Sequence, residues 1–522
     1  MADPSAARLT LRELLSPVDC HGSGNAAVRG IATDSRHVQP GDVFFARPGL
    51  RVDGRRFMQQ AVANGAVAVV SAADPLATAM HSSGVDVVNG VAVIAVDDIN
   101  AVLGIASARL HGSPCQSLRL FGVTGTNGKT TVAYLLAHVL DKLGGCGLIG
   151  TLGAGRPGEI IPTTHTTPEV TRTNELLAKF AASRTQYVAM EVSSHGIAQG
   201  RICGLVFDTA IFTNFSQDHL DYHGDMESYW SAKEGLFKSE GLGTAIVNLD
   251  DPCATRIKAP AGGQLLGYSA HAGVAGAELT VTVDERSEGP ELRLQINGAW
   301  GPAELESRLV GDFNAYNLAA VILALLNAGV SLADACRYLS LADAPPGRMQ
   351  WLGGGDRPVA VVDYAHTPAA LRVALRASAT LLDERLSRGR LWCVFGCGGE
   401  RDKDKRAQMG AIAAGLADRV MITDDNPRAE PSAEIIADIL AGIAKPTDVM
   451  VEADRAQAIH RVISAAKVGD VILVAGKGHE TSQERAGVRT LFSDVQEVRR
   501  ALCAYTSIGH TSADWNYPGL AS

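Results

Sequence analysis

Apolar runs and segments with a helical pattern alternate through most of the chain. The runs are short and rich in Val, Leu, Ile and Ala, as buried strands are, and they lie at 67–70, 120–123, 187–190, 359–362, 391–395 and 471–475. Strands that alternate with helices form βαβ units, in which parallel strands are covered by helices. The pattern therefore predicts an α/β protein built on parallel sheets.

Length and turn signals divide the chain into domains. A chain of 522 residues is too long for one core. Turns at 111–114 (His-Gly-Ser-Pro) and 344–347 (Ala-Pro-Pro-Gly) provide boundaries, so we expect three domains at 1–112, 113–345 and 346–505. The polar segment 506–522 is expected to be a disordered tail. Alternating Val, Thr and Leu in the Gly-rich region 265–303 predict an antiparallel insert.

Composition and charge restrict the classes of function. Apolar residues make up 46% of the chain and charged residues 20%, as in ordinary globular proteins. The net charge of −9 gives no general attraction to nucleic acid or to an anionic membrane. The first residues lack the pattern of a secretory signal, and the apolar runs are too short to span a bilayer. With nine scattered cysteines, the pattern predicts a cytoplasmic protein with reduced thiols.

The segment 118–137 has the layout of a nucleotide-binding strand, loop and helix. Glycines in the loop let backbone N–H groups approach phosphates, and the helix that follows directs its positive N-terminal end at them. Lys129 would reach the β- and γ-phosphates, and the Thr130 hydroxyl would bind Mg²⁺. Val123 stands where the strict motif has its first glycine, so this is a variant P-loop. The predicted ATP-binding residues are Gly125, Thr126, Asn127, Gly128, Lys129, Thr130 and Thr131.

A second polar stretch, 190–201, follows a predicted buried strand. Glu191 then lies near the carboxyl end of that strand, where parallel sheets place their ligands. Its carboxylate can hold Mg²⁺ together with Thr130. Hydroxyl, amide and guanidinium groups suited to a polar, anionic substrate follow on Ser193, Gln199 and Arg201.

The stretch 212–233 concentrates two histidines, four carboxylates and a lysine. His219 and His223 are four residues apart, which suggests a zinc site on a helix, but Gly224 interrupts the helix. Carboxylates dominate this stretch, and such oxygen donors favour Mg²⁺ over Zn²⁺.

These motifs together resemble the ATP-dependent Mur ligases of peptidoglycan synthesis. The resemblance covers nearly all of residues 30–500. It is carried by Gly125-Thr-Asn-Gly-Lys-Thr-Thr131, Glu191-Val-Ser-Ser-His-Gly196, Asp218-His-Leu-Asp-Tyr-His223, Asp34-Ser-Arg36, Gly41-Asp-Val-Phe-Phe-Ala46, Asp53-Gly-Arg-Arg-Phe57, Thr166-Thr-Pro168, Leu309-Val-Gly-Asp-Phe-Asn-Ala-Tyr-Asn317 and Asp363-Tyr-Ala-His-Thr-Pro368. It implies a three-domain Mur ligase architecture with an N-terminal uridine-nucleotide domain, a central P-loop ATPase domain and a C-terminal Rossmann-like domain that binds the amino acid.

The resemblance also implies the roles of individual residues. Lys129, His219 and a carbamylated Lys233 would be catalytic, and two Mg²⁺ ions would be held by Thr130, Glu191, His219 and Lys233. Further ATP contacts would come from Asn314, Asn317, Arg348 and Asp363. The UDP-N-acetylmuramoyl dipeptide would be bound by Thr33, Ser35, Leu50, Arg51, Val52, His165, Thr166, Thr167, Ser193, Gln199 and Arg201.

In the third domain, Phe395-Gly-Cys-Gly-Gly-Glu-Arg-Asp-Lys403, Asp424-Asp-Asn-Pro-Arg428 and Gly476-Lys-Gly-His-Glu480 resemble the family member that adds meso-diaminopimelate. This amino acid carries one carboxylate more than lysine, and an arginine can bind a carboxylate through two parallel hydrogen bonds. Asp404 stands where the family commonly has glycine. The implied amino-acid site consists of Arg401, Asp425, Asn426, Pro427, Arg428, Gly476 and Glu480.

The implied activity joins meso-diaminopimelate to the glutamate side-chain carboxylate of UDP-N-acetylmuramoyl-L-alanyl-D-glutamate. ATP would become ADP and phosphate, and an acyl phosphate would be the intermediate. The expected protein is a cytoplasmic monomer that serves cell-wall synthesis, cell shape and division. Its partners would be small molecules, with neither nucleic acid nor membrane insertion.

Three other functions remain open at this stage. A sister ligase would add lysine or another amino acid at the same step. Folylpolyglutamate synthetase shares the variant P-loop, although the N-terminal motifs Asp34-Ser-Arg36 and Asp53-Gly-Arg-Arg-Phe57 argue against it. A P-loop switch protein would hydrolyse ATP without forming an amide, and such a protein has no need of the clusters around Glu191 and Lys233.

Overall fold

The computed structural model describes residues 9–20, 23–49, 52–73, 86–284, 292–382, 389–445 and 449–505. The predicted tail 506–522 lies outside these residues, as do Leu50 and Arg51. Contacts divide the chain into two compact units. The first unit comprises the described parts of Met1–Thr282, Gln295–Glu304 and Ala315–Leu339, and the second comprises those of Val283–Leu294, Leu305–Asn314 and Ser340–Ser522.

The first unit begins with a five-stranded sheet of order β1-β2-β3-β5-β4. All neighbouring strands are parallel except β4 and β5, which pair antiparallel. The carboxyl ends of β1 and β2 therefore meet at one edge of the sheet. The elements are α1 (Leu11–Leu15), β1 (Gly30–Ala32), β2 (Asp42–Ala46), α2 (Met58–Ala63), β3 (Ala68–Ala72), β4 (Asp86–Val88), β5 (Val91–Val96) and α3 (Ile99–Leu110).

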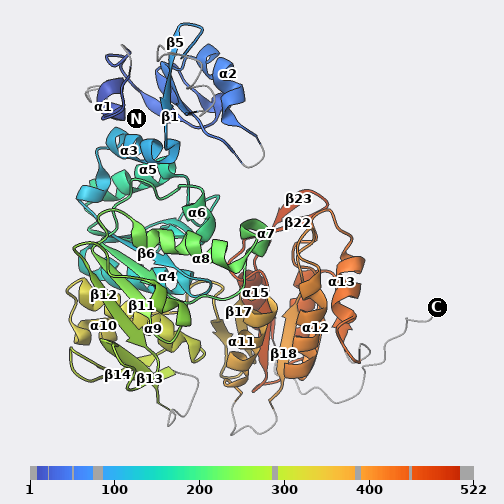
Figure 1. Cartoon of the computed structure of the whole chain (residues 1–522). Helices are drawn as coiled ribbons and strands as arrows, with labels where there is room; N and C mark the ends of the chain where they lie inside the picture. The colour runs from blue at the N-terminus through green and yellow to red at the C-terminus, as the bar shows by residue number, and fades with distance from the viewer. Residues whose placement is uncertain are drawn as a thin grey trace. The chain divides into compact units, whose positions relative to one another are not determined.

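The same unit contains the P-loop strand β6 (Figure 1). Strand β6 lies between β10 and β9, and β7 follows β9, all in parallel. Helix α4 packs on β6, β7 and β9. The elements are β6 (Arg119–Thr124), α4 (Lys129–Gly144), β7 (Cys146–Gly150), β8 (Gly153–Gly155), α5 (Val170–Ala182), β9 (Tyr187–Glu191), α6 (Ser194–Ala198), β10 (Thr209–Phe212), α7 (Leu220–His223), α8 (Met226–Glu234) and β11 (Thr244–Asn248).

The prediction of an antiparallel insert at 265–303 is wrong for its first part. Strand β12 (Gln264–Ser269) pairs in parallel with β11, and β13 (Leu279–Val283) pairs in parallel with β12. Both strands thus extend the central sheet. Alternating apolar and polar residues indicate a half-exposed strand but do not state its direction, which depends on the connection before it. The elements that follow are β14 (Leu292–Gly298), β15 (Ala303–Ser307), α9 (Phe313–Asn327) and α10 (Leu332–Leu339).

The second unit is a doubly wound sheet of order β16-β17-β21-β18-β19-β20. Among the described strands of this sheet, only β16 is antiparallel to its neighbour, and β22 and β23 form a separate antiparallel pair. Its elements are β16 (Gln350–Gly353), β17 (Val359–Asp363), α11 (Pro368–Ala379), β18 (Leu391–Phe395), α12 (Asp404–Leu416), β19 (Arg419–Ile422), α13 (Ser432–Leu440), β20 (Met450–Val451), α14 (Arg455–Ala465), β21 (Val471–Ala475), β22 (Ser482–Arg485), β23 (Val488–Leu491) and α15 (Asp494–Ala504).

Strand β18 shows how this sheet is buried on both faces. Leu391, Cys393 and Phe395 pack in a core with α11, α12 and α13, which stand side by side in Figure 1. Trp392 and Val394 point the other way and pack with α14 and α15. Successive side chains of a strand alternate between faces, so a strand covered on both sides reads as an uninterrupted apolar run. The predicted strand at 391–395 is confirmed.

A buried ion pair joins two strand ends of the second unit. The Arg455 guanidinium at the start of α14 donates to both carboxylate oxygens of Asp494, at 2.7 and 2.8 Å, and both side chains are fully buried. The same guanidinium donates to the carbonyls of Asp424 and Ala475, at 3.2 and 2.8 Å. Arg455 therefore ties the loop after β19 to the end of β21.

We expect Arg455→Met to lower the free energy of unfolding by about 3–5 kcal/mol, because the substitution leaves the Asp494 carboxylate buried without its partner. Chemical denaturation with urea measures this change. Arg461→Met is the matched control on the same helix. Arg461 pairs with Glu452 at 2.7 Å but is 53% exposed, so we expect a loss below about 1 kcal/mol. Equal losses in the two variants would contradict the structural role of the buried pair.

Candidate functional site

The P-loop connects β6 to α4 through two glycines whose positive φ and close neighbours disfavour any side chain. Gly125 has a φ of +148°, and a Cβ there would lie 1.9 Å from Thr213 Oγ1. Gly128 has a φ of +85°, and a Cβ there would lie 2.4 Å from Asn317 Oδ1. The loop therefore depends on residues without side chains, as a backbone cradle for phosphates requires.

The segment after β10 holds the P-loop from the other side. Thr126 N donates to the Asn214 carbonyl at 2.8 Å, and Asn127 N donates to Asn214 Oδ1 at 2.9 Å. Thr213 Oγ1 donates to the Asn127 carbonyl at 2.6 Å. These bonds join the carboxyl ends of two neighbouring parallel strands and tie the loop to the segment after β10.

Glu191 ends β9 next to the P-loop and is 1% exposed. Thr130 Oγ1 donates to Glu191 Oε2 at 2.9 Å. Thr151, just past β7, donates its backbone N–H to Oε1 at 2.8 Å and its hydroxyl to Oε2 at 3.0 Å. The segments that follow three neighbouring parallel strands thus bring the Thr130 and Thr151 hydroxyls to the Glu191 carboxylate.

Lys233 is a buried amine beside the P-loop. It lies on α8, is 1% exposed, and donates to the Gly125 carbonyl at 2.7 Å. Its Nζ also lies 4.4 Å from the ring centroid of Tyr229. Burial, reinforced by the charge of Lys129, lowers the pKa of Lys233 well below its ordinary value. This shift increases the share of the neutral amine, which is the nucleophilic form of a lysine.

Histidine and tyrosine rings line the same region. The His195 ring centroid lies 4.8 Å from that of His219, 4.2 Å from Tyr222 and 5.4 Å from His223. Burial, with the charge of His219 second, lowers the pKa of His195 to about 4. Burial also lowers the pKa of His219. Neutral imidazoles with free lone pairs are metal ligands and hydrogen-bond partners rather than cations.

The predicted substrate residues of the central domain lie together before α5 and at both ends of α6. Thr167 Oγ1 donates to the Glu191 carbonyl at 2.9 Å and lies 3.1 Å from Ser193 Oγ. Arg201 donates to the Thr167 carbonyl at 2.8 Å and to Gln199 Oε1 at 2.5 Å. In the same group, Thr166 Oγ1 lies 3.1 Å from Thr151 Oγ1, and the His165 side chain is exposed.

Glu169 connects this cluster to the N-terminal sheet. Its carboxylate pairs with Arg201 at 3.1 Å and with Arg47, which follows β2, at 3.0 Å. Arg47 also donates to the Gln199 carbonyl at 2.7 Å. The strand ends of the N-terminal sheet and the cluster around Arg201 are therefore in direct contact within the first unit.

The N-terminal candidates follow β1 and β2, whose carboxyl ends share one edge. Thr33 is exposed, and Val52 is 50% exposed. Ser35 is buried and donates to Gln60 Oε1 at 2.8 Å. The described members of this group thus occupy one edge of the sheet. Leu50 and Arg51 belong to the same prediction but lie outside the described residues.

The predicted amino-acid site lies entirely in the second unit, at the carboxyl ends of β18, β19 and β21. Arg428 has a φ of +54° and donates to the Gly399 carbonyl at 2.7 Å. Glu480 accepts a bond from Asn426 Nδ2 at 2.9 Å. Asp425 is buried, and a Cβ on Gly476 would lie 2.8 Å from Asp425 Oδ2. Arg401 is exposed. Arg401 and Arg428 both lie beside Gly398, because a Cβ added to Gly398 would lie 3.5 Å from Arg401 Cγ and 3.0 Å from Arg428 Nη1.

Two further nucleotide candidates are close together at the end of β17. The Asp363 carboxylate accepts the backbone N–H groups of Met349 and Ala365, at 2.8 and 2.9 Å, and burial raises its pKa. The Arg348 guanidinium lies 4.6 Å from the ring centroid of Tyr364. Asn314 donates to the Val310 carbonyl at 2.8 Å, within the second unit. Asn317 faces Gly128 in the first unit.

Sequence reasoning missed several residues that the structure places in these sites. Thr151 follows a strand of the central sheet, and its position directly after that strand was the available signal. Tyr229 lies four residues before Lys233, one helical turn away. Lys477 stands inside the Gly-Lys-Gly-His-Glu motif and donates to Glu480 Oε2 at 2.7 Å. That these three residues belong to the sites can be recognised only from the tertiary structure, which brings strand ends and helix faces together.

The donor set around the P-loop fits Mg²⁺. The Thr130 hydroxyl and the Glu191 carboxylate are hard oxygen ligands, and Mg²⁺ is commonly bound by one or two such groups together with substrate phosphates. Across the part of the chain that the structure describes, no cluster of three or more His, Cys, Asp or Glu side chains is arranged to hold a metal by itself. Phosphate oxygens and water molecules would complete the coordination.

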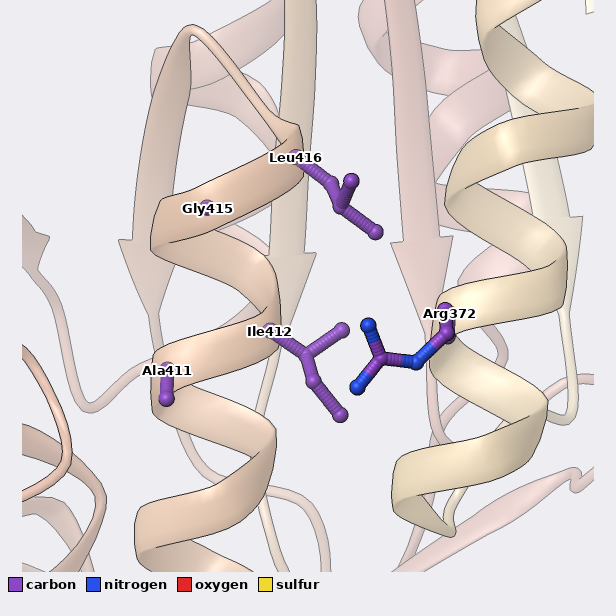
Figure 2. Close-up of a pocket in the computed structure, with 5 residues that line it drawn as sticks. All are labelled: Arg372, Ala411, Ile412, Gly415 and Leu416. Atoms are coloured by element: carbon purple, nitrogen blue, oxygen red, sulfur yellow. The ribbon is translucent and has the colours of Figure 1, made fainter.

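Two surface cavities lie away from these residues. Figure 2 shows one of about 200 Å³ between α11 and α12, where the Arg372 side chain points toward Ile412 and Leu416. Another of about 380 Å³ lies at the amino ends of the central strands, around the Arg119–Asp208 ion pair. Neither contains a predicted site residue. Within the described ranges, no helix has the length and apolarity that crossing a membrane requires.

Comparison with known proteins gives consistent matches along the chain. The profile described as the Mur ligase family catalytic domain matches residues 27–111, the Mur ligase middle domain matches 123–325, and the glutamate ligase domain matches 347–478. A protein of Pseudomonas aeruginosa named UDP-N-acetylmuramoyl-L-alanyl-D-glutamate–2,6-diaminopimelate ligase is 45% identical over 480 residues, which cover 92% of this chain and 96% of that protein. A protein of Alkalilimnicola ehrlichii with the same name is 45% identical over 504 residues, covering 95% and 99%.

Solved structures agree with the sequence matches. A structure of a UDP-N-acetylmuramoyl-L-alanyl-D-glutamate–2,6-diaminopimelate ligase aligns with a TM-score of 0.70 and 33% identity, covering 95% of this chain and 99% of that chain. The MurF ligase of Thermotoga maritima in complex with ADP aligns with a TM-score of 0.59 and 19% identity, covering 91% and 97%. The second likeness concerns the fold alone.

We expect Gly125→Ala to weaken ATP binding at least about tenfold, because the new methyl group collides with Thr213 and displaces the backbone of the phosphate loop. Isothermal titration with ATP and Mg²⁺ measures the change. Gly415→Ala is the control, since a Cβ there meets no atom within 4 Å. Equal ATP affinity in Gly125→Ala and the unmodified protein would contradict a phosphate-binding role for the loop.

Proposed function

The chain belongs to the Mur ligase family, and we propose that it adds meso-diaminopimelate to UDP-N-acetylmuramoyl-L-alanyl-D-glutamate at the expense of ATP. The observation that carries this proposal is the cluster of Arg428, Asp425, Asn426 and Glu480 at the strand ends of the second unit. This cluster combines a guanidinium, which can bind a carboxylate of a diamino acid, with carboxylates, which can bind its ammonium groups. Relatives of this name cover more than nine-tenths of the chain.

ATP would bind at the P-loop, with its triphosphate against the backbone of 125–128. Thr130 and Glu191 would hold a Mg²⁺ ion, which neutralises charge on the transferring phosphoryl group. Lys129 donates to the carbonyls of Gly125 and Thr126, at 2.8 and 2.9 Å, so its ammonium lies over the loop. From there it would stabilise the negative charge of the β- and γ-phosphates. Asn314, Asn317, Arg348 and Asp363 are proposed as further nucleotide contacts.

The reaction would proceed in two steps. A side-chain carboxylate oxygen of the D-glutamate attacks the γ-phosphorus, ADP leaves, and an acyl phosphate remains. A neutral amine of diaminopimelate then attacks the acyl carbon, loses a proton and expels phosphate, which leaves the new amide bond. Activation is required because a free carboxylate is a poor electrophile. The hydrogen bonds that Thr213 and Asn214 make to the loop support the positioning that phosphoryl transfer depends on.

Thr167, Ser193, Gln199 and Arg201 are proposed to orient the dipeptide part of the substrate, with His165 and Thr166 beside them. The uridine nucleotide would lie at the edge of the N-terminal sheet, near Thr33, Ser35 and residues 50–52. The contact of Arg47 with Glu169 and Gln199 supports this arrangement, because it joins the two substrate regions within one unit. We further propose a cytoplasmic monomer with domains at 1–112, 113–345 and 346–505.

Lys233 is proposed to carry a carbamate. Its neutral amine can attack CO₂ and lose a proton, which converts a buried amine into an anionic oxygen ligand. Burial and the neighbouring Lys129 both lower the pKa of Lys233, which increases the share of the neutral, nucleophilic amine. With His219, the carbamate would help to hold a second Mg²⁺ ion near the reacting carboxylate. Lys129, His219 and Lys233 are the proposed catalytic residues.

We expect the purified protein to release phosphate from ATP only when the UDP-muramoyl dipeptide and meso-diaminopimelate are both present. L-Lysine lacks the second carboxylate that Arg428 would bind. We therefore expect the rate of phosphate release with L-lysine to be less than about one-tenth of the rate with meso-diaminopimelate. A coupled phosphate assay measures both rates. Release with ATP alone would instead identify a P-loop switch, and equal rates with lysine would contradict the proposed amino-acid specificity.

Arg428→Ala tests the residue itself. We expect the KM for meso-diaminopimelate to rise at least about tenfold, because a charge-assisted pair is lost, while the KM for ATP stays within about twofold. Arg461→Ala, on an exposed face of the same unit, is the matched control and should leave both values unchanged. An unchanged KM for meso-diaminopimelate in Arg428→Ala would remove Arg428 from the site.

Carbamylation of Lys233 predicts a specific isotopic signal. With ¹³C-labelled bicarbonate, we expect one carbamate resonance in the carbon NMR spectrum of the active protein and none in Lys233→Met. Activity of Lys233→Met should fall at least about a hundredfold because an anionic ligand is lost. Lys238→Met, an exposed lysine just after the same helix, is the control. A fully active protein without the resonance would contradict the proposal.

A further inference from the structure

Lys477 is a fully buried lysine at the predicted amino-acid site, in the loop that follows β21. A buried ammonium is costly unless anions and acceptors surround it. Lys477 Nζ donates to Glu480 Oε2 at 2.7 Å and to Asn426 Oδ1 at 3.0 Å, and it lies 3.8 Å from Asp425 Oδ1. All three partners belong to the site proposed for meso-diaminopimelate.

The bonds of Lys477 determine how Asn426 is oriented. Asn426 Oδ1 accepts from Lys477 Nζ and from the backbone N–H of Glu484, at 3.0 Å each. The amide therefore directs Nδ2 the other way, where it donates to Glu480 Oε2 at 2.9 Å. Lys477 and Asn426 thus hold the same carboxylate oxygen from two directions, so the Glu480 side chain is constrained.

Exposure separates the roles of these residues. The Lys477 side chain is 0% exposed, whereas that of Glu480 is 31% exposed. A ligand in the site can therefore reach the glutamate but not the lysine beneath it. We propose that Lys477 is a positioning residue that orients Glu480 and Asn426 to receive the ammonium group of the amino-acid substrate. This inference rests on the proposed function and deepens it.

Charge supports the same conclusion. Burial alone would raise the pKa of Glu480, but the Lys477 ammonium and the Asn426 amide lower it below its ordinary value. Glu480 therefore stays ionised, as an ammonium receptor must. The charged or titratable groups that face it are Lys477 and His479 from its own loop, Asp425 after β19, Arg455 on α14 and Tyr364 after β17.

Removal of Lys477 has a defined consequence for pH dependence. Without the ammonium, the pKa of Glu480 rises, so the carboxylate loses its charge at a higher pH than in the unmodified protein. Affinity for the substrate ammonium would then fall as the pH is lowered. Burial lowers the pKa of His479 to about 4, so this histidine stays neutral between pH 6 and 9 and does not produce such a change.

The experiment measures kcat and the three KM values of Lys477→Met between about pH 6 and 9. We expect the KM for meso-diaminopimelate to rise at least about tenfold at pH 8 and further at pH 6, while those for ATP and the UDP-muramoyl dipeptide stay within about twofold. Lys477→Arg, which keeps the charge, should restore part of the loss. Lys467→Met, an exposed lysine before β21, is the matched control and should behave like the unmodified protein.

A double-mutant cycle separates positioning from general support of the fold. If Lys477 acts through Glu480, Lys477→Met should change the KM for meso-diaminopimelate much less in a Glu480→Gln background. Thermal unfolding shows whether each variant is folded, and Lys477→Gln replaces Lys477→Met if the latter is not. Additive effects in the cycle, an unchanged KM, or an equal rise of all three KM values would each overturn the inference.

The two proposals fail in different ways. If the unmodified protein shows no release of phosphate that depends on meso-diaminopimelate, the proposed function fails, and with it the substrate assigned to this site. If the unmodified protein is active and Lys477→Met has the same KM and pH profile, only the role of Lys477 is refuted.

Discussion

The carbonyl oxygen of Gly125 accepts hydrogen bonds from two lysines, and the central site is organised around this shared acceptor. Lys129 lies 2.8 Å from it and Lys233 lies 2.7 Å from it. Two ammonium groups so close together repel each other. Burial is the larger cause that lowers the pKa of Lys233, and the charge of Lys129 is the second. The lowered pKa shifts Lys233 towards the neutral amine that covalent modification requires. Lys129 instead lies over the loop that the phosphates would occupy.

In both units, the candidate functional residues lie at the carboxyl ends of parallel strands. In the first unit, β6, β7, β9 and β10 contribute the P-loop, Thr151, Glu191 and Thr213. In the second, the loop after β19 and the end of β21 are tied together by Arg455, which donates to the Asp424 and Ala475 carbonyls. A rigid sheet with buried supports allows side chains from distant segments to meet with little freedom.

Much of this arrangement was predictable from local sequence. The six apolar runs correspond to strands β3, β6, β9, β17, β18 and β21, because buried parallel strands require uninterrupted apolar residues. The P-loop was recognisable since its glycines and Lys129 follow a strand directly. The predicted antiparallel direction of β12 and β13 was wrong, because side chains alternate in the same way in parallel and antiparallel strands. Lys477 was overlooked, since nothing local distinguishes a buried lysine from an exposed one.

The sequence by itself determined the α/β class, the P-loop and the motifs that mark the family, because each depends on residues adjacent in the chain. The tertiary structure decided which of these residues meet. Only strand order brings the hydroxyls of Thr130 and Thr151 to the carboxylate of Glu191. Only burial lowers the pKa of Lys233 and hides the Lys477 side chain from solvent beside Glu480. Electrostatic free energy depends on the surroundings of a charge, and those surroundings come from segments far apart in sequence.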